Sequence, residues 1–169
     1  LALCDNLDVV HNMFLGRELK AGITLSETAM EKRAGDTLRS LSVRTLRSLR
    51  QQVSSLSGGQ RQTVAIARSL LGDPKVIILD EPTAALGVEQ TAEVLNLIER
   101  LRERGLGVIM ISHNMEDVRA VADRIAVLRL GRNNGVFTTS EVSTEDLVAA
   151  ITGAKDNAAT RRSRERKNP

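Results

Sequence analysis

Aromatic residues and cysteine are scarce in this sequence. Its 169 residues include no Trp, no Tyr and two Phe, Phe14 and Phe137. A single cysteine, Cys4, excludes a disulfide framework and a cysteine-based zinc site within one chain. The lack of aromatic side chains also argues against binding of single-stranded nucleic acid by base stacking.

Long apolar runs are absent as well. No stretch of 18 or more apolar residues occurs, so no membrane-spanning helix is predicted. No basic and then apolar leader opens the chain, which argues against a secretory signal. The chain begins with Leu1 rather than Met, and we expect a fragment or a processed start. Its 41% apolar and 27% charged residues are ordinary for one folded domain with a modest core.

Charge is spread unevenly along the chain. The net charge is +3, but residues 155–169 hold six basic and two acidic residues, so the remainder is close to neutral. We predict that this tail is disordered and solvated, with contact to anionic lipid or nucleic acid as the less favoured alternative. Residues 37–72 contain six arginines and no acid, which suits either a polyanionic ligand or a solvated face.

Hydrophobic spacing divides the chain into two parts. Residues 1–55 are expected to be mostly helical and polar, with Ser26 as a helix N-cap. From residue 56 onward, helices and strands alternate. The expected strands are 76–79, 108–111, 125–130 and 136–138, the first two buried on both faces, with a hairpin turn at 132–135. This order predicts an α/β fold with a parallel sheet wrapped by helices.

The segment Leu56-Ser57-Gly58-Gly59-Gln60 opens a predicted helix. Ser57 can cap that helix, and the two glycines allow another molecule to approach the backbone closely. Free N–H groups at a helix start favour a phosphate. The alternative is an ordinary capped helix, which the Ser-Gly-Gly segment alone would favour.

Polar residues follow each of the two strands that are expected to be buried, 76–79 and 108–111. Asp80 and Glu81 end the first strand, where Asp80 is placed to hold Mg²⁺ and Glu81 to polarise an attacking water. His113 follows the next strand, and could contact a terminal phosphate or orient that water. A structural histidine would be the default reading of His113 alone, and His11 is left as structural or surface.

Together, these segments resemble the ATP-binding cassette (ABC) family of ATPases. Residues 56–60 match the family signature, 76–81 the Walker B strand, and His113 the switch histidine. The resemblance covers residues 1–152, and other short segments look like bacterial carbohydrate importers of the ribose, xylose and fructose type. It implies a P-loop NTPase-like fold: a helical subdomain at 1–55, the carboxyl-terminal portion of the α/β core at 56–152, and a basic tail at 153–169.

The resemblance also assigns roles to residues. It implies that Glu81 and His113 are catalytic, that Asp80 holds Mg²⁺, and that residues 56–60 (Leu56, Ser57, Gly58, Gly59 and Gln60) bind ATP. Two departures stand beside these matches. No Gly-x-x-x-x-Gly-Lys-[Ser/Thr] loop occurs, so we expect that the first third of the domain is missing. Gly87 replaces the usual aspartate of the D-loop, which puts subunit communication in doubt.

The function that the resemblance implies is the ATP-hydrolysing subunit of a sugar importer at the cytoplasmic face of the membrane. Its partners would be a second ATPase subunit, a transmembrane permease and, indirectly, a sugar-binding protein, with no nucleic acid expected. The alternatives are a non-transport cassette protein that acts on nucleic acid or ribosomes, and a degenerate subunit that lends only its signature. We expect the 169-residue chain alone to bind ATP poorly and not to hydrolyse it.

Overall fold

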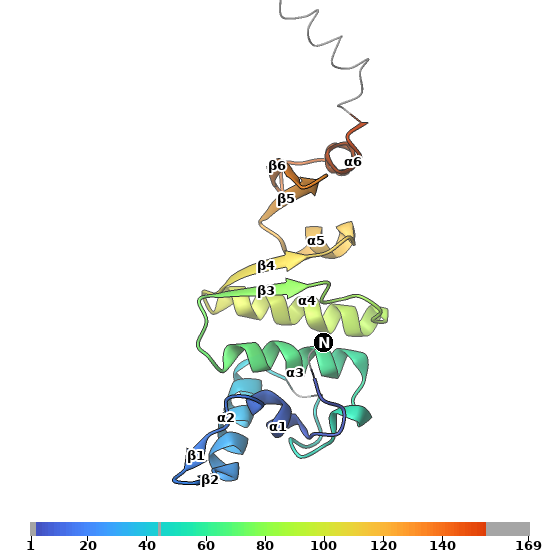
Figure 1. Ribbon diagram of the computed structural model, residues 1–169. Helices are drawn as coiled ribbons and strands as arrows, with labels where there is room; N and C mark the ends of the chain where they lie inside the picture. Colours follow the sequence, from blue (N-terminus) through green and yellow to red (C-terminus); the bar gives the residue numbers. More distant parts are fainter. Residues whose placement is uncertain (1–2, 44, 155–169) are drawn as a thin grey trace, which may run out of the picture. The chain divides into compact units, whose positions relative to one another are not determined.

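The computed structural model describes residues 3–43 and 45–154, which divide into two compact units, one up to Asp117 and the other from Val118 onward (Figure 1). The predicted basic tail, from residue 155 onward, lies outside the described residues. The predicted boundary after residue 55 stays a prediction. Among the described residues, no helix combines the length and the apolar composition that a membrane crossing needs.

The first unit begins with a helical part. Helix α1 (Val9–Phe14) is capped by Asp8, whose carboxylate accepts a hydrogen bond from the His11 N–H at 2.7 Å. A small hairpin of β1 (Lys20–Ala21) and β2 (Thr24–Leu25) leads to α2 (Glu27–Ser40), and a 3₁₀ turn follows at Val53–Ser55. Ser26 occupies the predicted N-cap position of α2, but its side chain makes no capping hydrogen bond.

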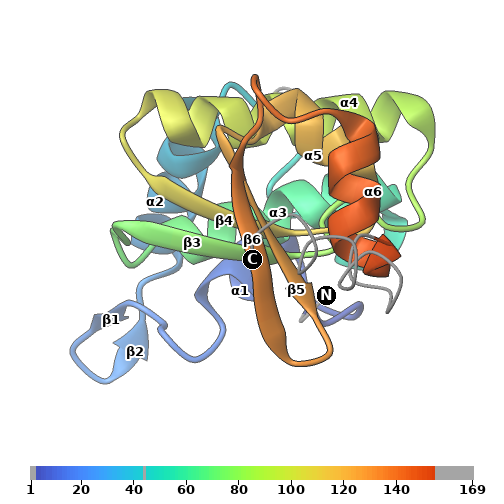
Figure 2. The same cartoon turned by 90° about the horizontal axis from the view of Figure 1, so that it is seen from above.

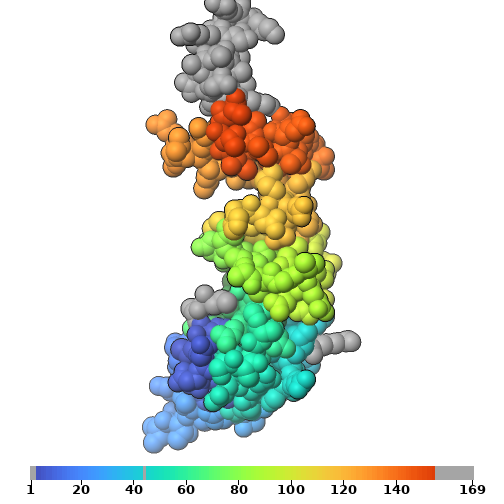
Figure 3. Space-filling model, turned by 90° about the vertical axis from the view of Figure 1, so that its right-hand side faces the viewer, coloured from blue at the N-terminus to red at the C-terminus, as the bar shows by residue number. Residues whose placement is uncertain are grey.

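Two longer helices and a strand pair complete this unit. Helix α3 (Gly58–Leu70) packs against α1 on one side and α4 (Val88–Glu103) on the other, and α4 contacts β4 (Figure 1). Figure 3 shows the α3 and α4 segments, teal and yellow-green, meeting on one face without a gap. The core between these helices contains Val64, Ile66, Ala67, Val94, Leu97, Ile98 and Leu101. In α4, the spacing of three and four residues places Val94, Leu97, Ile98 and Leu101 in one apolar stripe.

The strands β3 (Val76–Asp80) and β4 (Gly107–Ile111) pair in parallel, as predicted. Ile77 and Leu79 are buried, at 5% and 7% exposure, but Ile78 on the opposite face is 66% exposed. Successive side chains of a strand point to opposite faces, so one face of the pair is covered and the other is open. The expectation that both strands are buried on both faces is therefore wrong for the described residues.

The second unit contains an antiparallel hairpin and a helix. Helix α5 (Met115–Val121) ends in this unit and is followed by β5 (Arg124–Arg129) and β6 (Arg132–Thr138), with α6 (Thr144–Thr152) alongside (Figure 2). The turn is Leu130-Gly131, both with positive φ, and not the predicted 132–135. Two consecutive positive φ angles suit a two-residue hairpin loop, so residues 132–135 belong to β6.

Candidate active site

Glu81 and His113 come together at the carboxyl ends of β3 and β4. The parallel register pairs Asp80 with Ile111, so the residues that follow each strand leave the sheet at the same edge. The Nδ1 atom of His113 lies 2.8 Å from Oε1 of Glu81, within hydrogen-bond distance. Glu81 and His113, which are 32 residues apart in sequence, are therefore in direct contact.

The backbone fixes the direction of the Glu81 side chain. Its N–H donates to the carbonyl of Ile111 at 2.9 Å, which extends the parallel ladder one residue beyond β3. Its φ is +47°, a left-handed conformation that costs a non-glycine residue about 1–3 kcal/mol. The strand therefore stops abruptly at Glu81, and the chain turns away while the carboxylate stays at the sheet edge.

The Glu81 carboxylate changes the acid–base behaviour of His113. Its hydrogen bond to the ring and its negative charge both raise the pKa of His113 above the ordinary value of 6.5. The imidazole is largely exposed, and only its Nδ1 is engaged by Glu81. The Nε2 atom is therefore available to a ligand, and in the protonated ring it is a hydrogen-bond donor.

Asp80 is the candidate magnesium ligand. Its side chain is exposed at the end of β3 and forms no hydrogen bond or ion pair with another described residue. No group of three or more His, Cys, Asp or Glu residues that could hold a metal occurs within the described part of the chain. Mg²⁺ commonly binds through one or two carboxylates together with water and substrate phosphates, and a single open carboxylate fits that pattern.

A buried hydrogen bond, which the sequence did not reveal, supports this cluster. The Thr83 hydroxyl donates to the Asp117 carboxylate at 2.6 Å, and both residues are buried. The bond ties the turn after Glu81 to the first turn of α5, which follows His113. Two buried polar residues 34 positions apart carry no periodic signal, and only the fold brings them together.

The glycine corner, which we define as Ser57, Gly58, Gly59 and Gln60, begins α3. The Ser57 hydroxyl accepts from the Gln60 N–H at 3.2 Å, and the Gln60 side-chain oxygen accepts from the Ser57 N–H at 3.0 Å. This capping box satisfies two of the four N–H groups that a helix start leaves unpaired. The N–H groups of Gly58 and Gly59 have no acceptor among the described residues and remain available to an anion.

Comparison with known proteins shows which family the chain is similar to. Residues 5–84 match the ABC transporter family. A fructose import ATP-binding protein of Rhizobium meliloti is 48% identical over an alignment of 163 residues that covers 92% of this chain and 63% of that protein. A xylose/arabinose import ATP-binding protein of Sulfolobus acidocaldarius is 40% identical, over 90% of this chain and 60% of that protein. The chain is therefore similar to the ATP-binding cassette family over most of its length.

Solved structures agree with the family and with the predicted fold class. A dimeric ATP-binding cassette in a post-hydrolysis state, bound to ADP and phosphate, superimposes with a TM-score of 0.65 at 29% identity, covering 82% of this chain and 59% of that one. A metal-chelate type ABC transporter in an inward-facing state gives 0.72 at 27% identity, covering 86% and 58%. The P-loop NTPase fold of the cassette is confirmed, and the chain spans about 60% of the length of the relatives it matches.

The arginines expected to attract a polyanion are mostly engaged within the cassette. Arg50 bonds Glu27 and Glu31 at 2.8 Å, and Arg61 bonds Asp5 at 2.8 Å. Arg39 pairs with Asp36. Because these acids lie outside residues 37–72 or at their edge, the sequence window looked more basic than the folded surface is. These ion pairs argue against a polyanion site built from Arg39, Arg50 and Arg61.

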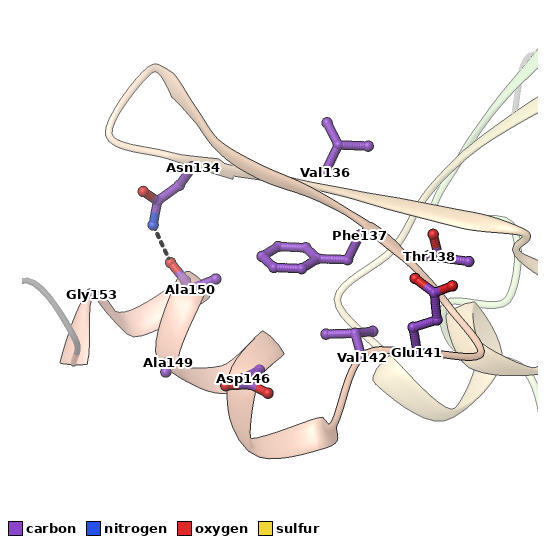
Figure 4. Close-up of a pocket in the computed structure, with 10 residues that line it drawn as sticks. All are labelled: Asn134, Val136, Phe137, Thr138, Glu141, Val142, Asp146, Ala149, Ala150 and Gly153. Carbon is purple, nitrogen blue, oxygen red and sulfur yellow. Dashed lines mark hydrogen bonds between the residues drawn. The ribbon is translucent and has the colours of Figure 1, made fainter.

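The residues that line two pockets can be compared with the predicted site residues. One of about 410 Å³, between α3 and β3, is lined by Ile77–Glu81 and includes both acids. Another of about 500 Å³ lies between β6 and α6, where Phe137 and Val142 point inward and the Asn134 amide donates to the Ala150 carbonyl at 2.6 Å (Figure 4). None of the predicted site residues lines the second pocket, so the candidate active site of this cassette is the edge of β3 and β4.

Proposed function

We propose that the whole protein is the ATP-hydrolysing subunit of an ABC sugar importer. The relatives named above are sugar import ATP-binding proteins, which supports carbohydrate uptake as the process. The observation that carries the enzymatic part is the 2.8 Å contact between Glu81 and His113 at the carboxyl ends of two parallel strands. A degenerate subunit would have no need to keep these two side chains together.

We infer a role for each side chain, and the geometry supports it. Glu81, whose carboxylate lies at the sheet edge, accepts the proton of the water that attacks the terminal phosphate of ATP. His113 is held through Nδ1 by Glu81, and its Nε2 donates to a terminal phosphate oxygen. Bound at Asp80, Mg²⁺ would supply positive charge that offsets the charge of the phosphates.

The glycine corner serves a second nucleotide. In this family two cassettes enclose two ATP molecules, and the signature of one faces the phosphate loop of the other. The free N–H groups of Gly58 and Gly59 suit the terminal phosphate of a nucleotide held by the second subunit. The Leu56 side chain is buried at 6% exposure, so its contribution is to anchor the corner rather than to touch the nucleotide.

The partners follow from the same proposal. A second ATPase subunit completes each nucleotide site, and a transmembrane permease receives the closing movement at the cytoplasmic face of the membrane. A sugar-binding protein acts indirectly by delivering the sugar to the permease. The 169-residue chain contains no Gly-x-x-x-x-Gly-Lys-[Ser/Thr] loop, so we expect this chain by itself to bind ATP weakly and not to turn it over.

The substitution Glu81→Gln in the whole protein tests the catalytic assignment. We expect the Mg-ATP turnover to fall about 100-fold or more, because a general base is lost, while ATP binding is kept. The pKa of His113, followed by NMR, should fall toward 6.5 because the carboxylate that raises it is gone. Turnover that survives Glu81→Gln would refute the assignment, and a wild-type protein without turnover would favour the signature-lending alternative.

A further inference from the structure

The hairpin tip, which we define as residues 128–132, exposes two large apolar side chains. Leu128 is 77% exposed and Leu130 is 85% exposed. Leu130 also has a φ of +49°, a left-handed conformation that bulky residues rarely adopt. Glycine or asparagine would suit a turn at this position better, so local folding does not require a leucine there. Exposed apolar side chains at such a position are typical of a contact surface.

Two arginines belong to the same hairpin tip. The antiparallel register places Arg129 directly opposite Arg132. Like charges at opposed positions of two paired strands repel each other, which destabilises the pair. Neither arginine forms an ion pair with an acid among the described residues. The hairpin tip therefore carries two positive charges that an anionic partner would neutralise.

The basic tail begins beside the hairpin tip. A Cβ atom at Gly153 would lie 2.4 Å from the Cζ atom of Arg129, so the guanidinium group packs directly against the glycine that ends α6. Residues 155–169, which follow at once, contain six basic and two acidic residues. The sequence alone favoured a solvated tail, because the tail has no apolar anchor of its own. The fold brings the end of α6, from which the tail continues, into contact with the hairpin tip.

We propose that the hairpin tip and the basic tail together bind an anionic membrane surface. The leucines enter the boundary between the lipid headgroups and the acyl chains, and the arginines lie at the level of the phosphates. Stable binding to a membrane takes two signals, and here an apolar insertion and a basic cluster supply them. Nucleic acid fits less well, because it offers no apolar layer for leucine and the chain has too few aromatic residues to stack on bases. This inference goes beyond the proposed function, because it assigns to the second unit a direct contact with lipid.

Sedimentation of the whole protein with lipid vesicles, without nucleotide or permease, tests the proposal. We expect binding to vesicles that contain phosphatidylglycerol and none to vesicles of pure phosphatidylcholine. The Leu130→Asn substitution should weaken binding about tenfold, because an apolar group that enters the bilayer is lost. Asparagine tolerates the left-handed backbone, so the unfolding midpoint should not fall. Ile23→Asn is the matched control: Ile23 lies in the turn between β1 and β2, is fully exposed, and should leave vesicle binding unchanged.

The same assay tests the charges of the hairpin tip. Arg132→Gln should weaken binding about fivefold, as expected for one basic residue near an anionic surface. The control is Arg124→Gln, which removes the same charge from the opposite end of β5, where Arg124 pairs with Thr138, and should have a smaller effect. Raising the salt concentration should reduce the difference between Arg132→Gln and wild type, because salt screens exposed charges.

Three results would overturn the proposal. Equal binding to the two kinds of vesicle would show that anionic lipid is not recognised. If Leu130→Asn binds like wild type while deletion of residues 155–169 abolishes binding, the tail acts without the hairpin tip. If RNA displaces the protein from vesicles and binds Leu130→Asn as tightly as wild type, the surface recognises nucleic acid. None of these measurements involves ATP turnover, so the outcome is independent of the proposed function.

Discussion

Two parts of the first unit use apolar residues in opposite ways. In the helical part, Val9, Val10 and Met13 of α1 are fully buried. In the strand pair, Ile78 is 66% exposed and Ile109 is 52% exposed, although both belong to continuous apolar runs. The apolar residues of α1 are therefore covered by other described residues, whereas one face of the sheet is not. An apolar run in the sequence indicates a strand surface that favours burial. It does not show that the described residues bury that surface.

Phe14→Ala should show the largest effect, because it removes a large side chain from the core of the helical part. Phe14 is 2% exposed, and we expect the free energy of unfolding to fall by about 3–5 kcal/mol. Chemical denaturation followed by circular dichroism measures the change. The control is Leu15→Ala at the neighbouring residue, which is 37% exposed and should cost less than about 1 kcal/mol. Equal losses at the two positions would contradict the buried core described for α1.

The next test compares adjacent residues on opposite faces of β3. Ile77→Thr places a hydroxyl group in the covered face and should lower the free energy of unfolding by about 1–3 kcal/mol. Ile78→Thr changes the open face and should alter it by less than about 0.5 kcal/mol. Self-association, measured by light scattering, should decrease for Ile78→Thr, because an exposed apolar surface favours association. A larger loss at Ile78 than at Ile77 would show that the open face is covered.

The smallest expected effect is the pH dependence of folding stability that His11 produces in the helical part. The pKa of His11 is raised by its hydrogen bonds to Asp8 at 2.7 Å and Glu27 at 3.1 Å, so the charged ring stabilises the folded state. This stabilisation is fully present below the unfolded pKa of about 6.5 and is lost as the pH rises through the higher folded value. Unfolding midpoints measured between pH 5 and pH 9 should fall across that window. The His11→Gln variant should show a flatter profile, and an unchanged slope would refute the assignment.

The sequence predicted which polar side chains lie at the sheet edge better than it predicted the contacts around them. Asp80, Glu81 and His113 could be found because each follows an apolar strand, and parallel strands bring their carboxyl ends to one edge. The bond between Thr83 and Asp117 and the contact of Leu86 with Gly58 could not, because they depend on how turns and helices pack in three dimensions.

The hairpin turn was misplaced for a related reason. The run Asn133-Asn134-Gly135 has the composition of a two-residue turn, but the chain turns at Leu130-Gly131 instead. Residues 132–135 therefore belong to strand β6. The side-chain amide of Asn134 donates a hydrogen bond to the Ala150 carbonyl of α6. A packing interaction with a later helix outweighs the local preference, and such an interaction has no trace in a short window of sequence.

The capping box at the start of α3 has a consequence for how an anion would bind there. Because Ser57 and Gln60 already fix each other without any ligand, the backbone amides beside them need not become ordered when a nucleotide arrives. Little conformational entropy is then lost on association. Under the proposed function, the glycine corner would therefore act as a site that is already ordered before a phosphate group binds.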